Sequence, residues 1–260
     1  MDNIKTVEEI EIMRENALLV SRTLAEVAKH IKPGVSTLEL DKVADQFIRD
    51  NGAEPGFLGY NGFPNTLCIS VNNVVVHGIP SDYCLREGDI VSVDCGTKMK
   101  GFYGDSAYTF AVGRISPEAE MLLKETKESL FRGIAMAVQG NRIGDVSNAI
   151  QTHVERLGYS VVREMVGHSI GRHMHERPDV PNYGRRGSGP KLVSGMVICI
   201  EPMINMGKKE VYCDRRDGWT VRTVDGSLSA HYELTVAVDR HKADVLSTFE
   251  FVDKVLNNKN

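Results

Sequence analysis

The stretch GDIVSVD at residues 88–94 is repeated in pattern by GMVICIE at residues 195–201. Each copy begins with glycine, continues as an apolar strand and ends on a carboxylate. A shorter pair of patterns follows, because Asp105 and Glu233 each precede another strand-like run. Coincidence is the alternative for matches this short. Taken as a repeat, they predict two halves related by a pseudo-two-fold axis, each supplying carboxylates to one shared site.

Capping residues predict two helices ahead of the strands in each half. The four expected helices run from Thr6 to Pro33–Gly34, from Ser36 to Asn51–Gly52, from Ser116 to near Gly140, and from Asp145 to Leu157–Gly158. The strand-like runs are residues 68–71, 74–76, 90–93, 109–112, 161–162, 196–200 and 234–238. Since no linker-like or low-complexity stretch separates the halves, we expect one α/β (α+β) domain over residues 1–260.

The bulk composition is that of a soluble globular protein, with 42% hydrophobic residues, 25% charged residues and a net charge of −4. This charge argues against binding of nucleic acid by bulk electrostatics. The N-terminus carries early acids and no apolar core, so it does not resemble a signal peptide. The sequence contains no run of 18 apolar residues, so we expect no membrane span.

The cysteines are odd in number, irregularly spaced and without a C-x-x-C pair. They are Cys68, Cys84, Cys95, Cys199 and Cys213. Several lie in apolar runs, where a thiol behaves as a small hydrophobic group. We therefore expect reduced, buried thiols and a cytoplasmic protein.

Four acidic residues end or interrupt apolar strands: Asp94, Asp105, Glu201 and Glu233. An ionised carboxylate beside a buried strand is costly unless it is paired or binds a metal. One such residue is usually explained by a salt bridge or a cap. Four such acidic residues in two matched pairs favour a metal site, and so does His168, which lies in a glycine-flanked turn.

The ligand types narrow the choice of metal. One imidazole and four carboxylates without a thiolate disfavour a structural zinc site. Mixed nitrogen and oxygen ligands suit Mn²⁺, Fe²⁺, Co²⁺ or Zn²⁺ in a catalytic role. Because five side chains are too many for a mononuclear site with open positions, two divalent ions sharing bridging carboxylates fit better. Such a pair holds a hydroxide and polarises a carbonyl, which is the chemistry of hydrolysis.

Six motifs extend this site along the chain. They are VHGIP at residues 76–80, GDIVSVD at 88–94, GFYGD at 101–105, GHSIG at 167–171, IEPM at 200–203 and DGWT at 217–220. In their order and spacing, from about residue 4 to residue 250, the chain resembles the type I methionine aminopeptidases. The resemblance implies the pita-bread fold, in which two pseudo-symmetric halves form an antiparallel sheet covered by helices. Because no N-terminal zinc-binding extension is present, the chain is similar to the short bacterial form.

The resemblance also implies a role for each residue of the metal site. Asp94 corresponds to the two-oxygen ligand of the first ion. Asp105 and Glu233 correspond to the bridging carboxylates. His168 and Glu201 correspond to the remaining ligands of the second ion, and Glu201 would also help to deprotonate the bridging water.

Two further histidines, His77 and His175, match the family's non-ligand histidines, which contact the substrate and stabilise the tetrahedral intermediate. That role requires a donor directed at developing negative charge, which histidine supplies. A satisfied core histidine is the alternative for His77, and the prolines after His175 indicate a loop. His173 and His231 match no role in the family and are expected to be structural.

An apolar pocket for the methionine side chain is implied as well. The matching positions are Phe57, Tyr60, Phe63, Cys68, Met174 and Trp219. Phe57 and Met174 depart from the cysteine and phenylalanine of the bacterial pattern, and Phe63 replaces a tyrosine, which leaves the pocket shape and the inhibitor preference open. All these side chains are apolar and polarisable, which suits a thioether. For Trp219, ordinary core packing is the alternative.

A monovalent-cation site of the family matches Asn72, Val74 and Ser229, for which hydrogen bonding within a turn is the alternative. The implied function is removal of the initiator methionine from nascent proteins whose second residue is small. The implied partners are nascent N-termini, with a ribosome contact conceivable and no nucleic acid or membrane. A monomer is expected, and the identity of the metal stays open.

Three other functions compete with this one. Residues 167–171 satisfy the G-x-S-x-G pattern of serine hydrolases, but that elbow must open a helix, and no helical periodicity follows. A non-enzymatic protein of the same fold should lack one or more ligands. A proline-directed peptidase of this fold usually carries a large N-terminal domain, whereas only 76 residues precede His77.

Overall fold

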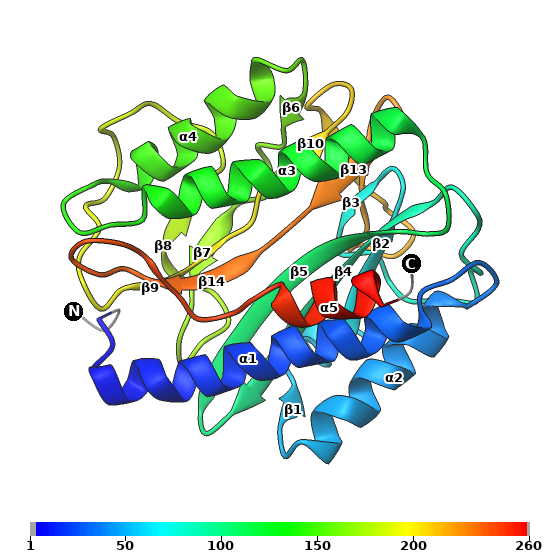
Figure 1. Cartoon of the computed structure of the whole chain (residues 1–260), viewed down its shortest axis with the longest axis horizontal. Helices are drawn as coiled ribbons and strands as arrows, with labels where there is room; N and C mark the ends of the chain where they lie inside the picture. The colour runs from blue at the N-terminus through cyan, green and yellow to red at the C-terminus, as the bar shows by residue number, and fades with distance from the viewer. Residues whose placement is uncertain (1–3, 259–260) are drawn as a thin grey trace.

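Both halves of the chain consist of two helices and a set of strands, as the repeated pattern predicts (Figure 1). The structure is a computed structural model and describes residues 4–258. The first half contains α1 (Val7–His30), α2 (Thr37–Asp50), β1 (Glu54–Pro55), the 3₁₀ helix η1 (Tyr60–Gly62), β2 (Leu67–Val71), β3 (Val74–Val76), β4 (Ile90–Met99) and β5 (Phe102–Ala111).

The second half has the same order and ends in an additional helix. It contains α3 (Pro117–Ala135), α4 (Ile143–Glu155), β6 (Ser160–Val161), β7 (Gly167–Ser169), β8 (Glu176–Val180), β9 (Val197–Ile200), β10 (Met203–Asn205), β11 (Val211–Cys213), β12 (Val221–Thr223), β13 (Ser229–His231), β14 (Leu234–Ala237), β15 (Asp244–Val245) and α5 (Glu250–Asn257). The sequence patterns did not predict α5, which packs against α1.

The capping boxes predicted for the first two helices are confirmed. The Thr6 hydroxyl accepts a hydrogen bond from the Glu9 amide, and the Glu9 carboxylate accepts one from the Thr6 amide. Ser36 and Glu39 make the same pair of bonds at α2. These contacts satisfy amides that the first helical turn leaves unpaired.

In the second half, the observed ends of the helices differ from the predicted ends. Ser116 caps α3 as expected, but α3 ends at Ala135 instead of near Gly140. The start predicted at Asp145 is wrong, because α4 begins at Ile143. Asp145 lies in the first turn of the helix, where its carboxylate accepts a hydrogen bond from the Arg142 amide at 2.8 Å. A carboxylate in the first turn can complete a cap without being the capping residue.

One long antiparallel pair, β4 with β5, forms the centre of the first half. Its strands are longer than the predicted runs, so Asp94 and Asp105 lie inside strands and do not end or precede them. In the second half, β14 pairs with β9, β9 pairs with β7, and Glu201 and Glu233 flank the β9–β14 pair. An antiparallel bridge between Ala107 and Glu233 connects the two sets of strands.

The helices cover the strands half by half. In Figure 1, α3 and α4 lie over the half that contains β9, β10 and β13, α1 and α5 lie over β4 and β5, and α2 packs beside α1 near β1. This arrangement of helices and antiparallel strands is the pita-bread fold that the sequence predicted.

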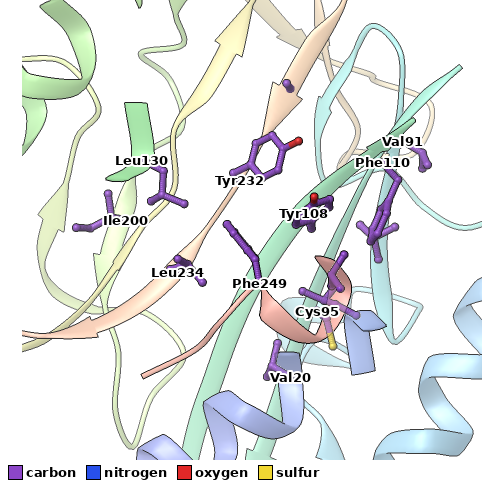
Figure 2. Close-up of a cluster of buried hydrophobic side chains, with 14 of the residues drawn as sticks. Val20, Val91, Cys95, Tyr108, Phe110, Leu130, Ile200, Tyr232, Leu234 and Phe249 are labelled. Atoms are coloured by element: carbon purple, nitrogen blue, oxygen red, sulfur yellow. The ribbon is translucent and has the colours of Figure 1, made fainter. Parts of the chain in front are cut away.

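The largest buried cluster lies between these helices and the strands and spans both halves. Figure 2 shows Tyr108 of β5 near Tyr232 and Phe249, and the ring centroids of both pairs are 5.0 Å apart. Edge-to-face pairs at this separation stabilise a core beyond the area they bury. The halves are therefore held together by apolar packing on the side of the strands that the helices cover.

The prediction of buried thiols is only partly correct. Cys68, Cys95 and Cys199 are buried, whereas Cys84 and Cys213 are exposed, and all five are free. Within residues 4–258, no helix combines the length and apolarity needed to cross a membrane.

Candidate metal centre

Two of the predicted carboxylates come from adjacent strands of the first half. Asp94 on β4 is opposite Ala107, and Asp105 on β5 is opposite Gly96. Because side chains alternate along a strand, these registers place Asp94 and Asp105 as diagonal neighbours on one face. Asp105 is buried, and Asp94 is partly exposed toward the cavity described below.

The other two carboxylates are brought to this face by the bridge between the halves. Leu234 pairs with Ile200, so Glu233 and Glu201 lie together at the end of the β9–β14 ladder. The Glu233 amide donates to the Ala107 carbonyl at 2.9 Å. Since Ala107 is the residue opposite Asp94, this bond places the acidic pair of the second half beside that of the first.

His168 on β7 completes the predicted set. Its Nε2 lies 3.7 Å from Asp105 Oδ2 and 3.8 Å from Glu201 Oε1. Its Nδ1 is 3.0 Å from the Ser169 carbonyl, which can only accept a hydrogen bond. Nδ1 therefore carries the proton, and Nε2 presents a lone pair to the carboxylates, as in metal-binding histidines.

The electrostatics of this cluster are unfavourable without a cation. Burial, and then repulsion from neighbouring carboxylates, raises the pKa of Asp105 and Glu233 well above the usual range. Burial raises the pKa of Asp94 to about 6 and also raises that of Glu201. Burial lowers the pKa of His168 to about 3. The protein thus concentrates four carboxylates and a neutral imidazole in one site, and within residues 4–258 no lysine or arginine forms an ion pair with them.

The donor set fits divalent metal ions. Within the described residues 4–258, buried oxygens of Asp94, Asp105 and Glu233 have no hydrogen-bond partner. Ligand atoms of Asp105, His168, Cys199 and Glu233 lie within 4.8 Å of one another, as do those of Glu201, His231 and Glu233. Buried acceptors without partners are costly, and cations relieve that cost.

These shifts predict how the stability of the chelated protein depends on pH. The carboxylates have folded-state pKa values above their unfolded values, so the folded chain binds more protons and loses stability as pH rises. His168 has a lowered pKa, so its contribution increases as pH rises to about 6.5 and is constant above that value. Above about pH 6.5, the carboxylates with strongly raised pKa values dominate.

We therefore expect the thermal unfolding midpoint in chelator to fall as pH rises from about 6.5 to 8.5. The variant Asp105→Asn, which removes one of the repelling carboxylates, should show a smaller fall. Calorimetry at a series of pH values measures both slopes. Equal slopes in the two proteins would contradict this account of the site.

A cavity of about 260 Å³ opens onto the carboxylates. Of the predicted residues outside the metal set, those that line it are Phe57, Tyr60, Phe63, His77, His175 and Trp219. Phe63 and Trp219 make an edge-to-face contact with ring centroids 5.2 Å apart. The cavity therefore joins an apolar wall to a charged floor, as a binding site does.

Cys68 and Met174 do not line this cavity. Both are buried in the apolar cluster behind it. Phe57 and Met174 pack against the same backbone, since a Cβ added to Gly96 would lie 2.5 Å from the Phe57 ring and 2.9 Å from Met174 Cε. Phe57 and Met174 are thus neighbours, and of the three departures from the bacterial pattern, Phe57 and Phe63 line the cavity whereas Met174 does not.

The two predicted non-ligand histidines flank the carboxylates. His77 has φ of 58°, a left-handed conformation that is uncommon outside glycine and is often kept at functional sites. Burial lowers the pKa of His77 to about 4. The His175 ring centroid is 4.3 Å from that of His168, and its Nδ1 is 2.8 Å from Tyr60 Oη.

Two of the three residues matched to a monovalent-cation site, Asn72 and Ser229, are in contact. The Ser229 amide donates to the Asn72 carbonyl at 2.9 Å, and Asn72 also binds Asp89 and Ile90 through its side chain. Val74 begins β3, two residues later. These hydrogen bonds of Asn72 agree with the alternative interpretation, in which the residue stabilises a turn and does not bind a cation.

His231, which was expected to be structural, lies beside a predicted ligand. Its Nε2 is 3.3 Å from Glu201 Oε2, and burial lowers its pKa. Its position two residues before Glu233 was the available signal, because that spacing returns to the same side of an extended chain. His173, the other histidine expected to be structural, is exposed.

The serine-hydrolase alternative is contradicted by the surroundings of Ser169. This residue ends β7, and the next element is the strand β8. Its hydroxyl donates to the Pro178 carbonyl at 3.0 Å. A nucleophile elbow requires an exposed serine at the start of a helix, and neither condition holds here.

Comparisons with known proteins agree with this geometry. Residues 11–240 match metallopeptidase family M24. The chain is 52% identical to a methionine aminopeptidase of Clostridium perfringens, with 94% of this chain and 98% of the relative covered. It is 53% identical to one of Clostridium acetobutylicum, with 95% and 99% covered. The crystal structure of methionine aminopeptidase from Rickettsia prowazekii superposes with a TM-score of 0.93 at 39% identity, covering 94% of this chain and 99% of that one. The chain therefore belongs to metallopeptidase family M24 and, within it, to the methionine aminopeptidases.

Proposed function

We propose that this chain removes the N-terminal methionine from newly made proteins whose second residue is small. One observation carries the proposal most directly: carboxylates from both halves and His168 converge on the floor of a small apolar cavity. An apolar cavity that ends at charged groups suits a terminal residue with a long apolar side chain and a nearby peptide carbonyl.

The residues that would hold the metal are Asp94, Asp105, His168, Glu201 and Glu233. Two divalent ions are proposed, with Fe²⁺, Mn²⁺, Co²⁺ and Zn²⁺ as candidates for a mixed nitrogen and oxygen site. When bound, such ions polarise a carbonyl and lower the pKa of water. Glu201 is partly exposed to the cavity, and its raised pKa suits a group that takes up a proton there.

The apolar wall positions the substrate. Phe57, Phe63 and Trp219 offer ring faces and edges to a thioether side chain, a favourable contact for sulfur. Tyr60 lines the same wall and binds His175. Cys68 and Met174 support the wall from behind.

The histidines would supply hydrogen bonds to the reacting peptide. If the Tyr60 hydroxyl donates to His175 Nδ1, the proton of His175 is on Nε2, where it can be donated to a substrate oxygen. His77 contacts the edge of Trp219 at a centroid distance of 6.2 Å, which holds its ring at the cavity. Donors fixed in this way stabilise negative charge on a carbonyl oxygen.

Further parts of the proposal follow from this function. Residues 1–260 would form one catalytic domain that acts as a monomer in the cytoplasm on nascent N-termini at the ribosome, without nucleic acid or membrane. A monovalent cation would bind at Asn72, Val74 and Ser229, where the Asn72 carbonyl accepts from the Ser229 amide and the Asn72 side chain donates to Asp89.

The deciding experiment measures free methionine released from Met-Ala-Ser and Met-Leu-Ser peptides. Mn²⁺, Fe²⁺ or Co²⁺ is added in separate reactions, and chelator is added in a control. We expect fast release from Met-Ala-Ser, slow release from Met-Leu-Ser and none with chelator. A leucine-first peptide such as Leu-Ala-Ser is the specificity control. Equal turnover of the leucine-first peptide would reject the proposed preference for methionine.

A further inference from the structure

His231 lies on the metal-facing side of the second half and has no role in the function proposed above. It ends β13, two residues before Glu233. Its Nε2 is buried, and within residues 4–258 it has no hydrogen-bond partner. A buried ring nitrogen without a partner is costly and calls for an explanation.

The nearest group to this nitrogen is a carboxylate of the metal site. His231 Nε2 is 3.3 Å from Glu201 Oε2, yet the two atoms do not meet the geometry of a hydrogen bond. Ligand atoms of His231, Glu201 and Glu233 all lie within 4.8 Å of one another. Two atoms that each lie about 2.1 Å from one ion are roughly 3.0–3.4 Å apart at bond angles of 90–109°. The observed separation of 3.3 Å falls within that range.

Glu201 has an imidazole on each side. Its Oε1 is 3.8 Å from His168 Nε2, and its Oε2 is 3.3 Å from His231 Nε2. The carboxylate thus divides its two oxygens between two histidines that come from different strands, β7 and β13.

The backbone of His231 is fixed by the strand that carries Asp105. The Thr109 hydroxyl donates to the His231 carbonyl at 2.6 Å and accepts from the His231 amide at 3.0 Å. On the other side, His231 pairs with Met203 of β10. This anchoring holds the imidazole in place before any ion binds, which metal sites require of their ligands.

We propose that His231 Nε2 is a further protein ligand of the metal centre and would bind the ion held by Glu201 and Glu233. The proposal rests on the metal centre proposed above. It gives the site two imidazoles in place of one, and added imidazole favours Fe²⁺, Co²⁺ or Zn²⁺ over Mn²⁺.

The test uses the full chain and Co²⁺. The variant His231→Gln keeps a side chain that can hydrogen-bond to Glu201 but lacks the imidazole nitrogen. Calorimetric titration of the chelated proteins with Co²⁺ gives the number of ions and their affinities, and X-ray absorption of the loaded proteins counts imidazole ligands. We expect two imidazoles per pair of ions in the unaltered protein, one in the variant, and a loss of at least about 100-fold in the affinity for one ion.

Two controls accompany the measurement. His173→Gln changes an exposed histidine outside the cavity and should leave both the affinities and the imidazole count unchanged. Thermal unfolding in chelator shows whether His231→Gln is folded before metal is added. If unfolding shows a folding defect, His231→Asn in the same X-ray absorption measurement replaces it.

A variant that binds both ions with the original affinities and the original number of imidazoles would overturn the proposal. Failure of the proposed function has a different signature, because the unaltered protein would then bind no Co²⁺ in the cavity or release no methionine from Met-Ala-Ser.

Discussion

Replacing Asp105 with asparagine should reduce methionine release from Met-Ala-Ser by about 10³-fold or more, since metal-assisted hydrolysis depends on several kcal/mol of charge stabilisation. Asp105 is buried between Asp94 and Glu233, and its Oδ2 faces His168 at 3.7 Å. Asparagine has nearly the same shape but offers the ions a neutral oxygen in place of a charged one. Initial rates at saturating Mn²⁺ or Co²⁺ measure the loss.

The same substitution should leave the metal-free protein at least as stable as before. Burial and neighbouring carboxylates raise the pKa of Asp105, so its ionised form opposes folding at neutral pH. A neutral amide removes that repulsion. Thermal unfolding in chelator should therefore give an equal or higher midpoint for Asp105→Asn.

Asp253→Asn is the matched control, because Asp253 is a carboxylate that pairs with Lys127 away from the cavity. It should keep full activity. If Asp105→Asn retained activity, or lost it only because the metal-free variant had unfolded, the assignment of Asp105 as a metal ligand would be wrong.

The parts of the fold that the sequence predicted are those decided by neighbouring residues. A capping box such as Thr6 with Glu9 is complete within four residues, and the run Val74–Val76 is apolar throughout. Only the last three residues of β5, Thr109 to Ala111, were predicted, because its first part, Phe102 to Tyr108, contains glycine and aspartate. Those residues are extended because they pair with β4, a contact that the local sequence does not encode.

The repeated pattern predicted that both halves supply carboxylates to one site, but not the backbone contact that brings them together. Motif spacing identified Asp94 and Glu233 separately, whereas their approach depends on the bridge between Ala107 and Glu233. His231 was expected to be structural because a single histidine in an apolar strand usually is. Only the folded chain places its Nε2 beside Glu201.

His175→Ala should lower kcat for methionine release by about 10²–10³-fold, the usual effect of removing one donor to a developing oxyanion. The side chain lines the cavity, and its ring lies 4.3 Å from that of His168. KM should change little, because the hydrogen bond strengthens as charge develops on the substrate oxygen. His173→Ala, two residues away and exposed, is the control and should keep the original kcat.

A substitution of Tyr60 tests whether its hydroxyl acts as a hydrogen-bond donor to His175 or whether its ring only packs in the cavity. Its hydroxyl lies 2.8 Å from His175 Nδ1 and, by donating there, keeps the His175 proton on Nε2. Tyr60→Phe preserves the ring and removes only that bond, worth about 1 kcal/mol, so kcat should fall by roughly five- to tenfold. In the double variant with His175→Ala, the loss from Tyr60→Phe should disappear, because the hydroxyl then has no imidazole to orient. Additive losses would mean that Tyr60 acts on the substrate directly and that the proton of His175 is placed by another group.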